Sequence, residues 1–312
     1  MNAFKNNAFD LTGDLSFFRF GNLDILRADY NIDIFVFFKT EVNAIKISSG
    51  KINKIILLHN AIDDIGFTDK ISYKSIDRFV INVDRSTDLL NFTRAHYDDG
   101  VTQDIRLIEL LNKYGLKCTF NLNSELLSKK GMLIREGKRI AHYKIHTEDV
   151  KHIYEGHEVA VHTLTHPNLT QCDDKEIIRQ VEADRLNLSE LVEYEVVGMA
   201  YPCGGVNNDD RVAGIIKKNT GVKYSRTITT NNCFDLQENL YRFNPTAYHL
   251  DFEKMMQLGR EFVEFKPKEP KVFYIWGHSY EMDYGADYWV KLEEFFKLIS
   301  NKEDIFYGTN KE

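Results

Sequence analysis

From about residue 89 onward, short apolar runs alternate with longer segments in which apolar positions recur every three or four residues. The short runs are typical of strands. They are residues 93–100, 117–123, 157–163, 196–202, 223–227 and 271–278. The longer segments are typical of amphipathic helices. They are residues 102–115, 173–194, 208–221, 252–265 and 286–300.

Repeated strand–helix units indicate a parallel sheet. Several of the strands are apolar throughout, which suits strands that are buried on both faces. Six or seven such units favour a barrel that closes on itself completely or incompletely, so residues 89–312 are predicted to form an α/β barrel domain of about seven strands. Thr102 is expected to cap the first helix and Gly115 to end it.

Residues 1–88 have a different pattern. Runs rich in β-branched and aromatic residues occur at 33–47, 54–62 and 78–83, with polar turns between them and no helical stripe. They predict a small β-rich N-terminal unit that precedes the main domain.

Composition narrows the range of functions. Hydrophobic residues make up 43% of the 312 residues and charged residues 28%, as in a globular protein. The net charge is −7 and the sequence shows no basic run, which argues against a nucleic-acid binder. The four cysteines form no CxxC pair, which argues against a thiolate zinc site.

The absence of recognisable targeting signals bears on where the protein is expected to be located. No apolar run is long enough to span a membrane. The first residues, MNAFKNNAFDLTGD, lack the layout of a signal peptide. The sequence as it stands therefore predicts a cytoplasmic protein, and export stays compatible with a leader that precedes it.

Polar residues gather where the predicted strands end. Asp98 and Asp99 end one strand, His162 and His166 follow a second, and His278 ends another. The carboxyl ends of parallel strands meet at one edge of the sheet, so these side chains are expected to converge. By contrast His142, His146, His152 and His157 are interpreted as surface or loop residues.

The spacing of His162 and His166 raises the question of a metal. The β-branched residues around them and Pro167 favour a strand that ends in a tight loop over a helix. Two imidazoles with one carboxylate would make the three-ligand set of a catalytic zinc site, and Asp99 is the candidate carboxylate. Alone, an HxxxH pair is a weak signal and a DDG triplet is most often a turn; their joint placement favours a site.

Four segments together resemble motifs of the polysaccharide deacetylase family, the NodB-homology group or carbohydrate esterase family 4. They are HYDDG from residue 96, HTLTHP from residue 162, MAYPCGG from residue 199 and YIWGH from residue 274. The resemblance covers roughly residues 90–312, and the second motif is the most specific. It implies a distorted (β/α) barrel and a hydrolase that removes acetyl groups from a carbohydrate.

The resemblance also implies roles for individual residues. Asp99, His162 and His166 would hold a divalent ion, zinc or else cobalt or nickel. Asp98 would be the general base and His278 the general acid.

The remaining residues of the implied site concern the substrate. The backbone N–H of Cys203 would stabilise the oxyanion. The substrate would be an acetylated carbohydrate. Tyr201 and Trp276 lie near the proposed pocket, where aromatic faces suit stacking on a sugar, and packing in the core is the alternative interpretation.

Two features depart from the family's pattern. The third motif usually has an arginine that orients the catalytic aspartate, and Ala200 stands in its place. The fourth motif, whose aspartate tunes the catalytic histidine, is not recognisable; residues 242–251 are the region where it is expected, with Asp251 as a candidate. Two alternatives therefore stay open: an amidohydrolase of a small cyclic imide or ureide, and a catalytically silent carbohydrate-binding protein.

Overall fold

The computed structural model describes residues 15–20, 23–28, 32–36 and 90–312. The chain divides into two compact units, Met1–Asp88 and Leu89–Glu312. In the first unit, strands β1 (Leu15–Phe20), β2 (Leu23–Ala28) and β3 (Ile32–Val36) form an antiparallel sheet in that order. β1 and β2 were not predicted. β3 covers the start of the run predicted at 33–47, and the runs at 54–62 and 78–83 lie outside the described residues.

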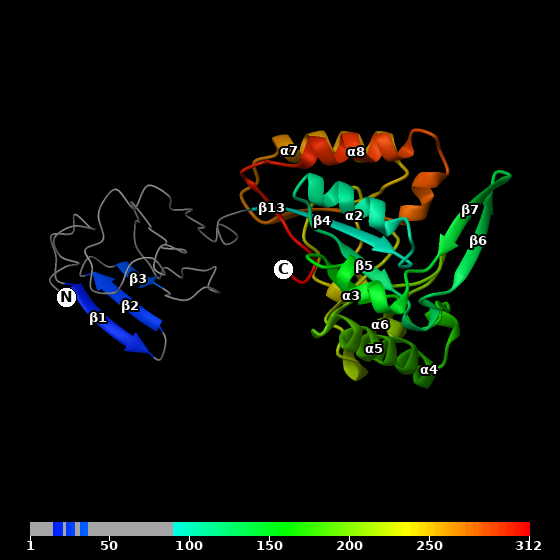
Figure 1. Ribbon diagram of the computed structural model, residues 1–312, viewed down its shortest axis with the longest axis horizontal. Helices are drawn as coiled ribbons and strands as arrows, with labels where there is room; N and C mark the ends of the chain where they lie inside the picture. The colour runs from blue at the N-terminus through cyan, green and yellow to red at the C-terminus, as the bar shows by residue number, and fades with distance from the viewer. Residues whose placement is uncertain (1–14, 21–22, 29–31, 37–89) are drawn as a thin grey trace. The chain divides into compact units, whose positions relative to one another are not determined.

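The second unit is built on one curled parallel sheet (Figure 1). Its order is β10-β9-β8-β5-β4-β12-β11, and β13 pairs with the first half of β4. The strands are β4 (Asn91–Asp98), β5 (Thr119–Leu122), β8 (Glu158–Val161), β9 (Gly198–Ala200), β10 (Tyr224–Arg226), β11 (Ala247–Tyr248), β12 (Lys271–Gly277) and β13 (Ile305–Tyr307). Seven strands in a curled half-barrel confirm the predicted distorted (β/α) barrel.

Helices cover the sheet and follow the strands in the predicted alternation (Figure 1). They are α2 (Asp104–Lys113), α3 (Val150–Ile153), α4 (Asp174–Ile178), α5 (Asp184–Val192), α6 (Asp210–Asn219), α7 (Phe252–Glu264) and α8 (Tyr288–Ile299). A π-helical turn, Arg179–Ala183, joins α4 to α5, so the single helix predicted at 173–194 is continuous but locally widened.

Apolar stripes fix the helices onto the core. α8 buries Leu292, Phe295 and Ile299, which share one face of the helix. α7 packs against this face so closely that a Cβ at Gly259 would lie 2.9 Å from the Phe295 ring. A small residue is therefore required at this crossing. Within the described residues, no helix combines the length and the apolar character needed to cross a bilayer.

The structure differs in two details from the helix predicted at residues 102–115. α2 begins at Asp104 with Gln103 at the N-cap, and no side chain accepts a hydrogen bond there, so Thr102 is not the cap. Ile105, predicted in the apolar stripe, is 43% exposed. Gly115 does end the helix, with a φ of 65° in the left-handed region that favours glycine.

One antiparallel hairpin was not predicted. β6 (Lys130–Arg135) and β7 (Lys138–Tyr143) pair over their full length and project beyond the rest of the unit (Figure 1). Glu136 and Gly137 both have positive φ, as in the tight turns that suit hairpins. Most of its residues are exposed, so the sequence lacks the apolar alternation that would reveal it.

Candidate active site

Sharp backbone turns bring the predicted metal ligands together. Asp99 follows β4 with a φ of 85°, and a Cβ on the next residue, Gly100, would lie 2.2 Å from the Leu122 side chain. His162 follows β8, and His166 lies in the same loop with a φ of 62°. Asp99, His162 and His166 each offer a ligand atom, and these atoms lie within 4.8 Å of one another. Two imidazoles and a carboxylate fit the donor set of a catalytic zinc site.

The second nitrogen of His162 is fixed by the backbone. Its Nδ1 lies 2.9 Å from the carbonyl oxygen of Ala200, so Nδ1 carries the proton and Nε2 keeps its lone pair for a metal. Burial lowers the pKa of His162 to about 4. The ring is therefore neutral at pH 7, as a metal ligand must be.

Two residues of the hairpin segment contact Asp99. Lys144 Nζ lies 3.2 Å from Asp99 Oδ1, and His142 Nε2 lies 3.2 Å from Asp99 Oδ2. Burial alone would raise the pKa of Asp99, but Lys144 and His142 lower it. The interpretation of His142 as a surface or loop residue is therefore wrong, because β7 carries it to the ligand group.

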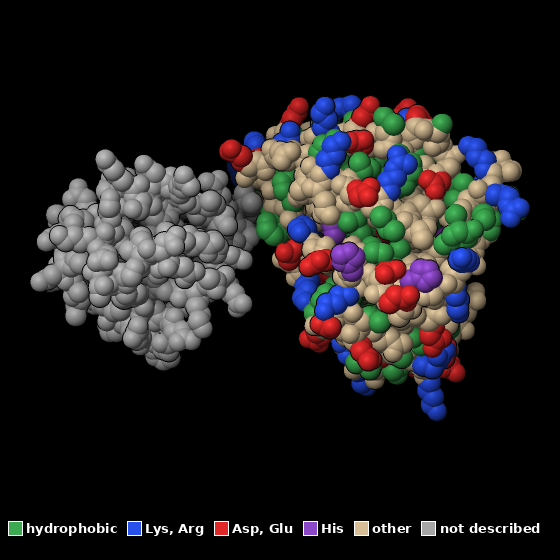
Figure 2. Space-filling view, in the orientation of Figure 1, with side chains coloured by type: hydrophobic (Ala, Val, Ile, Leu, Met, Phe, Trp, Pro, Cys, Tyr) green, Lys and Arg blue, Asp and Glu red, His purple; other side chains and the backbone are tan. Residues whose placement is uncertain are grey.

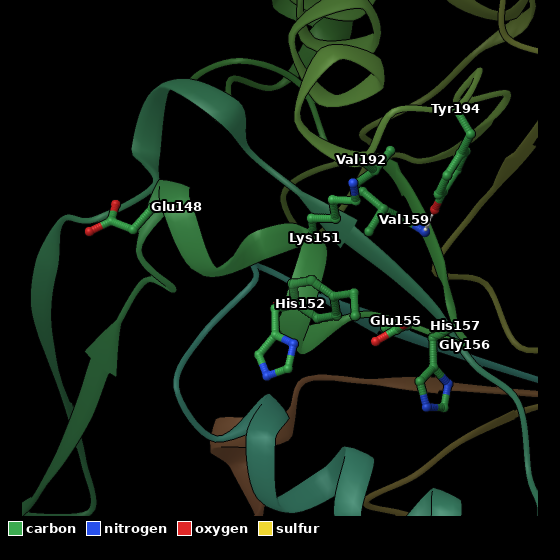
Figure 3. Close-up of a pocket in the computed structure, with 10 residues that line it drawn as sticks. Glu148, Lys151, His152, Glu155, Gly156, His157, Val159, Val192 and Tyr194 are labelled. Atoms are coloured by element: carbon green, nitrogen blue, oxygen red, sulfur yellow. Dashed lines mark hydrogen bonds between the residues drawn. The ribbon is translucent and has the colours of Figure 1, made fainter.

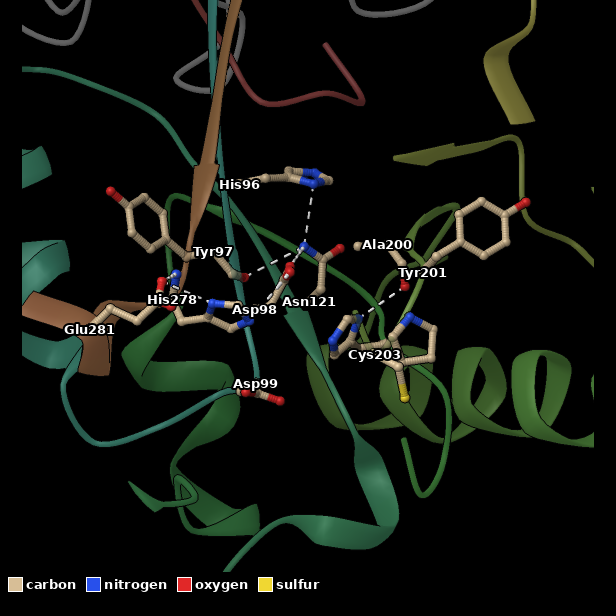
Figure 4. Close-up of polar contacts among 12 residues, drawn as sticks. His96, Tyr97, Asp98, Asp99, Asn121, Ala200, Tyr201, Cys203, His278 and Glu281 are labelled. Carbon is tan, nitrogen blue, oxygen red and sulfur yellow. Dashed lines mark hydrogen bonds and ion pairs between the residues drawn. The ribbon is translucent and has the colours of Figure 1, made fainter. Parts of the chain in front are cut away.

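Asp98 is held by a buried arginine that sequence reasoning missed. Arg226 on β10 pairs with Asp98 Oδ2. Asn121 Nδ2 donates to Asp98 Oδ1 at 2.8 Å (Figure 4). Burial would raise the pKa of Asp98, but the charge of Arg226, with lesser help from His162, lowers it to about 2. The carboxylate is therefore ionised at neutral pH.

The position of Arg226 explains the missing arginine of the third motif. In the parallel pairing of β9 with β10, Arg226 lies directly beside Ala200. Side chains at the same level of neighbouring strands point to the same face of a sheet. The charge that Ala200 lacks is therefore supplied one strand away.

His278 has a carboxylate partner that was also missed. It follows β12, and its Nδ1 lies 3.0 Å from Glu281 Oε2 (Figure 4). Burial alone would lower the pKa of His278, but Glu281 and the nearby aspartates raise it to about 9. Its Nε2 lies 4.0 Å from Asp98 Oδ2.

The carboxylate partner of His278 was expected within residues 242–251, with Asp251 as the candidate, and the structure does not place it there. Asp251 instead caps α7, where its Oδ1 accepts from the backbone N–H of Lys254 at 3.2 Å. Glu281 also accepts from His249 Nε2 at 2.7 Å and from the Tyr248 hydroxyl at 2.5 Å. Residues 242–251 thus reach the site through His249 and Tyr248 and not through Asp251.

The three residues assigned to the substrate lie in different surroundings. Cys203 lies in the loop after β9, with Sγ 3.7 Å from His166 Nδ1. Tyr201 is buried and its hydroxyl donates to the carbonyl oxygen of Tyr241 at 2.7 Å, so its side chain points away from the site (Figure 4). The Trp276 ring lies 4.7 Å from the Arg226 guanidinium and is 9% exposed. These contacts argue against Tyr201 as a substrate contact and make Trp276 a support for Arg226.

A separate cavity of about 440 Å³ lies at the opposite end of β8, near Val159 (Figure 3). Residues of α3 and of the loop after α5, among them Lys151, His152 and Tyr194, line it. The cavity contains none of the predicted site residues.

Comparisons with known proteins agree with the motifs. The family model described as polysaccharide deacetylase matches residues 94–224. Among solved structures, the chain is similar to a Streptococcus pyogenes deacetylase in complex with acetate, with 19% identity and a TM-score of 0.39, covering 48% of this chain and 61% of that one. It is similar to a Bacillus cereus polysaccharide deacetylase, with 18% identity and a TM-score of 0.36, covering 44% of this chain and 40% of that one.

A third similar structure is a family 4 carbohydrate esterase from Streptomyces lividans in complex with acetate. The identity is 12% and the TM-score 0.45, covering 70% of this chain and 93% of that one. The chain thus spans less than two thirds of the length of the first two structures. The similarity to the polysaccharide deacetylase family model therefore covers the segment that contains the first three motifs, HYDDG, HTLTHP and MAYPCGG.

Proposed function

We propose that this chain is a metal-dependent hydrolase that removes N-acetyl or O-acetyl groups from a carbohydrate. One observation carries the proposal. An ionised Asp98 and a protonated His278 lie 4.0 Å apart, beside the ligand group Asp99, His162 and His166. A base and an acid of opposite charge next to a metal site are what hydrolysis of an amide requires. A silent carbohydrate-binding protein would need neither charge.

Asp98 would take the proton from the attacking water. Arg226 and Asn121 each bind one of its oxygens. A carboxylate has about four acceptor positions, so lone pairs remain for the water. The same two contacts fix the direction in which the carboxylate points.

A divalent ion, zinc or else cobalt or nickel, held by Asp99, His162 and His166 would supply Lewis-acid chemistry toward the water and the acetyl oxygen. We propose that the backbone N–H of Cys203, whose loop contacts His166, donates to the same oxygen as it becomes negative. His278 would then give its proton to the departing amine as the carbon–nitrogen bond breaks. For an N-acetyl group the products are acetate and a free amino sugar.

The metal site is tested by elemental analysis of the purified protein. We expect about one zinc or similar ion per chain in the wild type and its loss in His162→Ala, because two remaining ligands seldom hold zinc. His152→Ala, which removes an exposed imidazole outside the site, is the matched control and should keep the ion. Wild-type protein without metal after zinc is supplied would contradict the proposal, as would acetylated hexosamine oligomers that stay intact with the loaded protein.

The pairing of His278 with Glu281 predicts a change in the pH profile. A general acid works only while protonated, so activity should fall as pH rises through the raised pKa of about 9. In Glu281→Gln the burial of His278 is no longer opposed by this carboxylate, and the alkaline limb of kcat/KM should move down by roughly 1–2 pH units. Glu293→Gln removes a carboxylate on α8 that pairs with Lys113, and it should leave the limb in place. An unshifted limb in Glu281→Gln would exclude His278 as the acid that this limb reports.

A further inference from the structure

The β6–β7 hairpin carries a cluster of exposed, unpaired basic side chains. Residues 129–144 contain six Lys or Arg residues and a single acid, Glu136. Five of the basic side chains are exposed, and within residues 90–312 no carboxylate lies within ion-pair distance of any of these five. They are Lys129, Lys130, Arg135, Lys138 and Arg139.

Several other basic residues of this unit do pair with carboxylates. Arg179 pairs with Glu176, Arg211 with Asp174, and Lys291 with Asp287. The basic residues of the hairpin are separated along the sequence, so no basic run was recognised, and strand pairing brings them together. Figure 2 shows Lys and Arg side chains together with apolar ones at the edge of the molecule where the hairpin projects.

Strand alternation divides these charges between two faces. His142 and Lys144 reach Asp99, so the residues two and four positions before His142, Ile140 and Lys138, share this inner face. Arg135 is directly opposite Lys138 across the hairpin and therefore lies on the same face. At about 3.3 Å per residue, Lys138 lies roughly 13 Å along the strand from His142, at the rim of the site.

Contacts hold this inner face against the segment that carries the catalytic histidine. Lys138 Nζ donates to the carbonyl oxygen of Tyr284 at 2.6 Å. Ile140 packs with Tyr280 and Val101 in a small apolar cluster, and the His142 ring lies 4.9 Å from the Tyr280 ring. Tyr280 belongs to the short 3₁₀ helix Ser279–Asp283, directly after His278. The cations are thus fixed in position relative to the site.

Protection of exposed strand edges is the alternative explanation for these charges, because lysine on edge strands prevents aggregation. Edge protection does not require cations on the face that borders a catalytic site. In a chain of net charge −7, a negatively charged substrate would be repelled unless a positive region lay beside the site.

From these observations we infer that the inner face of the hairpin recognises anionic groups of the substrate, so that the substrate is an acetylated glycan bearing carboxylates or phosphates. The inference rests on the proposed deacetylase function. Arg135 and Lys138 would bind an anionic sugar unit while the acetylated unit lies at the ligand group. A glycan chain would span the roughly 13 Å between these two places.

Measurements of binding affinity test the recognition of anionic groups separately from turnover. In a zinc-loaded Asp98→Asn background, the Kd is measured for a neutral N-acetylglucosamine tetramer, a tetrasaccharide that alternates uronate with N-acetylglucosamine, and a phosphodiester-linked N-acetylhexosamine oligomer. We expect an anionic glycan to bind more tightly than the neutral one, and the preference to disappear at high salt. Whichever anionic glycan binds more tightly identifies carboxylate or phosphate as the recognised group.

The two faces of the hairpin provide matched variants. Arg135→Gln with Lys138→Gln removes two charges from the inner face and should weaken anionic binding roughly tenfold, the combined effect of two exposed charge pairs. Lys130→Gln with Arg139→Gln removes two charges from the outer face and should have little effect. Arg135→Lys with Lys138→Arg keeps the charges and should keep the binding.

Three results would overturn the inference: equal affinity for neutral and anionic glycans, equal losses in both double variants, or an oligonucleotide that binds as tightly as the anionic glycans. The first result together with deacetylation of the neutral tetramer by the wild-type enzyme would leave the proposed function intact. Selective binding without turnover by the wild-type enzyme would support recognition by the hairpin and contradict the hydrolase proposal.

Discussion

Asp98→Asn is expected to lower kcat by about 10²- to 10⁴-fold, the usual contribution of a general base. The amide cannot take a proton from water, yet it keeps the size of the carboxylate. Asn121 can adapt to the change, because its Oδ1 is buried without a hydrogen-bond partner and would accept from the new amide if the Asn121 side chain rotated. The zinc content should stay at the wild-type value because the ligands are untouched.

The measurement is kcat on an acetylated oligosaccharide, with metal content determined on the same samples. Asp251→Asn is the control, since this aspartate caps α7 and does not contact Asp98. Wild-type turnover in Asp98→Asn would remove Asp98 from the role of base. Loss of metal in the variant would instead indicate that Asp98 helps to hold the ion.

Arg226→Met should destabilise the fold by about 3–5 kcal/mol, the usual result of removing one partner from a buried ion pair. Arg226 is fully buried and Asp98 is 1% exposed, so the aspartate would be left charged without its cation. The pKa of Asp98 should also rise, because burial then outweighs the remaining influences. Since the base works only when ionised, the acid limb of the activity profile should move to higher pH.

Denaturant unfolding measures the loss of stability in Arg226→Met. The pH profile of activity measures the rise in the pKa of Asp98. Arg242→Met is the matched control: Arg242 pairs with Asp210, which is highly exposed, and its loss should cost less than about 1 kcal/mol. Combining Arg226→Met with Asp98→Asn should recover part of the lost stability, because no unpaired charge would remain. Equal destabilisation by the two arginine variants would contradict the importance of the buried pair.

The barrel and the polar strand ends could be predicted because their signals are local. Strands buried on both faces are apolar throughout, and helices repeat every three or four residues, so neither requires knowledge of distant contacts. Asp99, His162 and His166 were predicted to converge in this way. The three candidate ligands meet because parallel strands bring their carboxyl ends to one edge of the sheet.

What could not be predicted depends on pairing between distant segments. Arg226 reaches Asp98 across the sheet, 128 residues away along the chain. His142 reaches Asp99 only because a mostly exposed hairpin folds over the site. Two signals were nevertheless present: an arginine inside a predicted strand is unusual in a buried sheet, and Glu281 stands three residues after His278. This second spacing is that of a capping box, which the structure contains.

The pairing of Ala200 with Arg226 has a consequence for where the cation beside Asp98 can be placed in the chain. Neighbouring positions on parallel strands present their side chains at the same height, so a guanidinium on either strand could neutralise the same carboxylate. An arginine at position 200 is therefore expected to substitute for the one at position 226 and to keep Asp98 ionised. The cation that acts on this carboxylate is identified by its place in space and not by its place in the sequence.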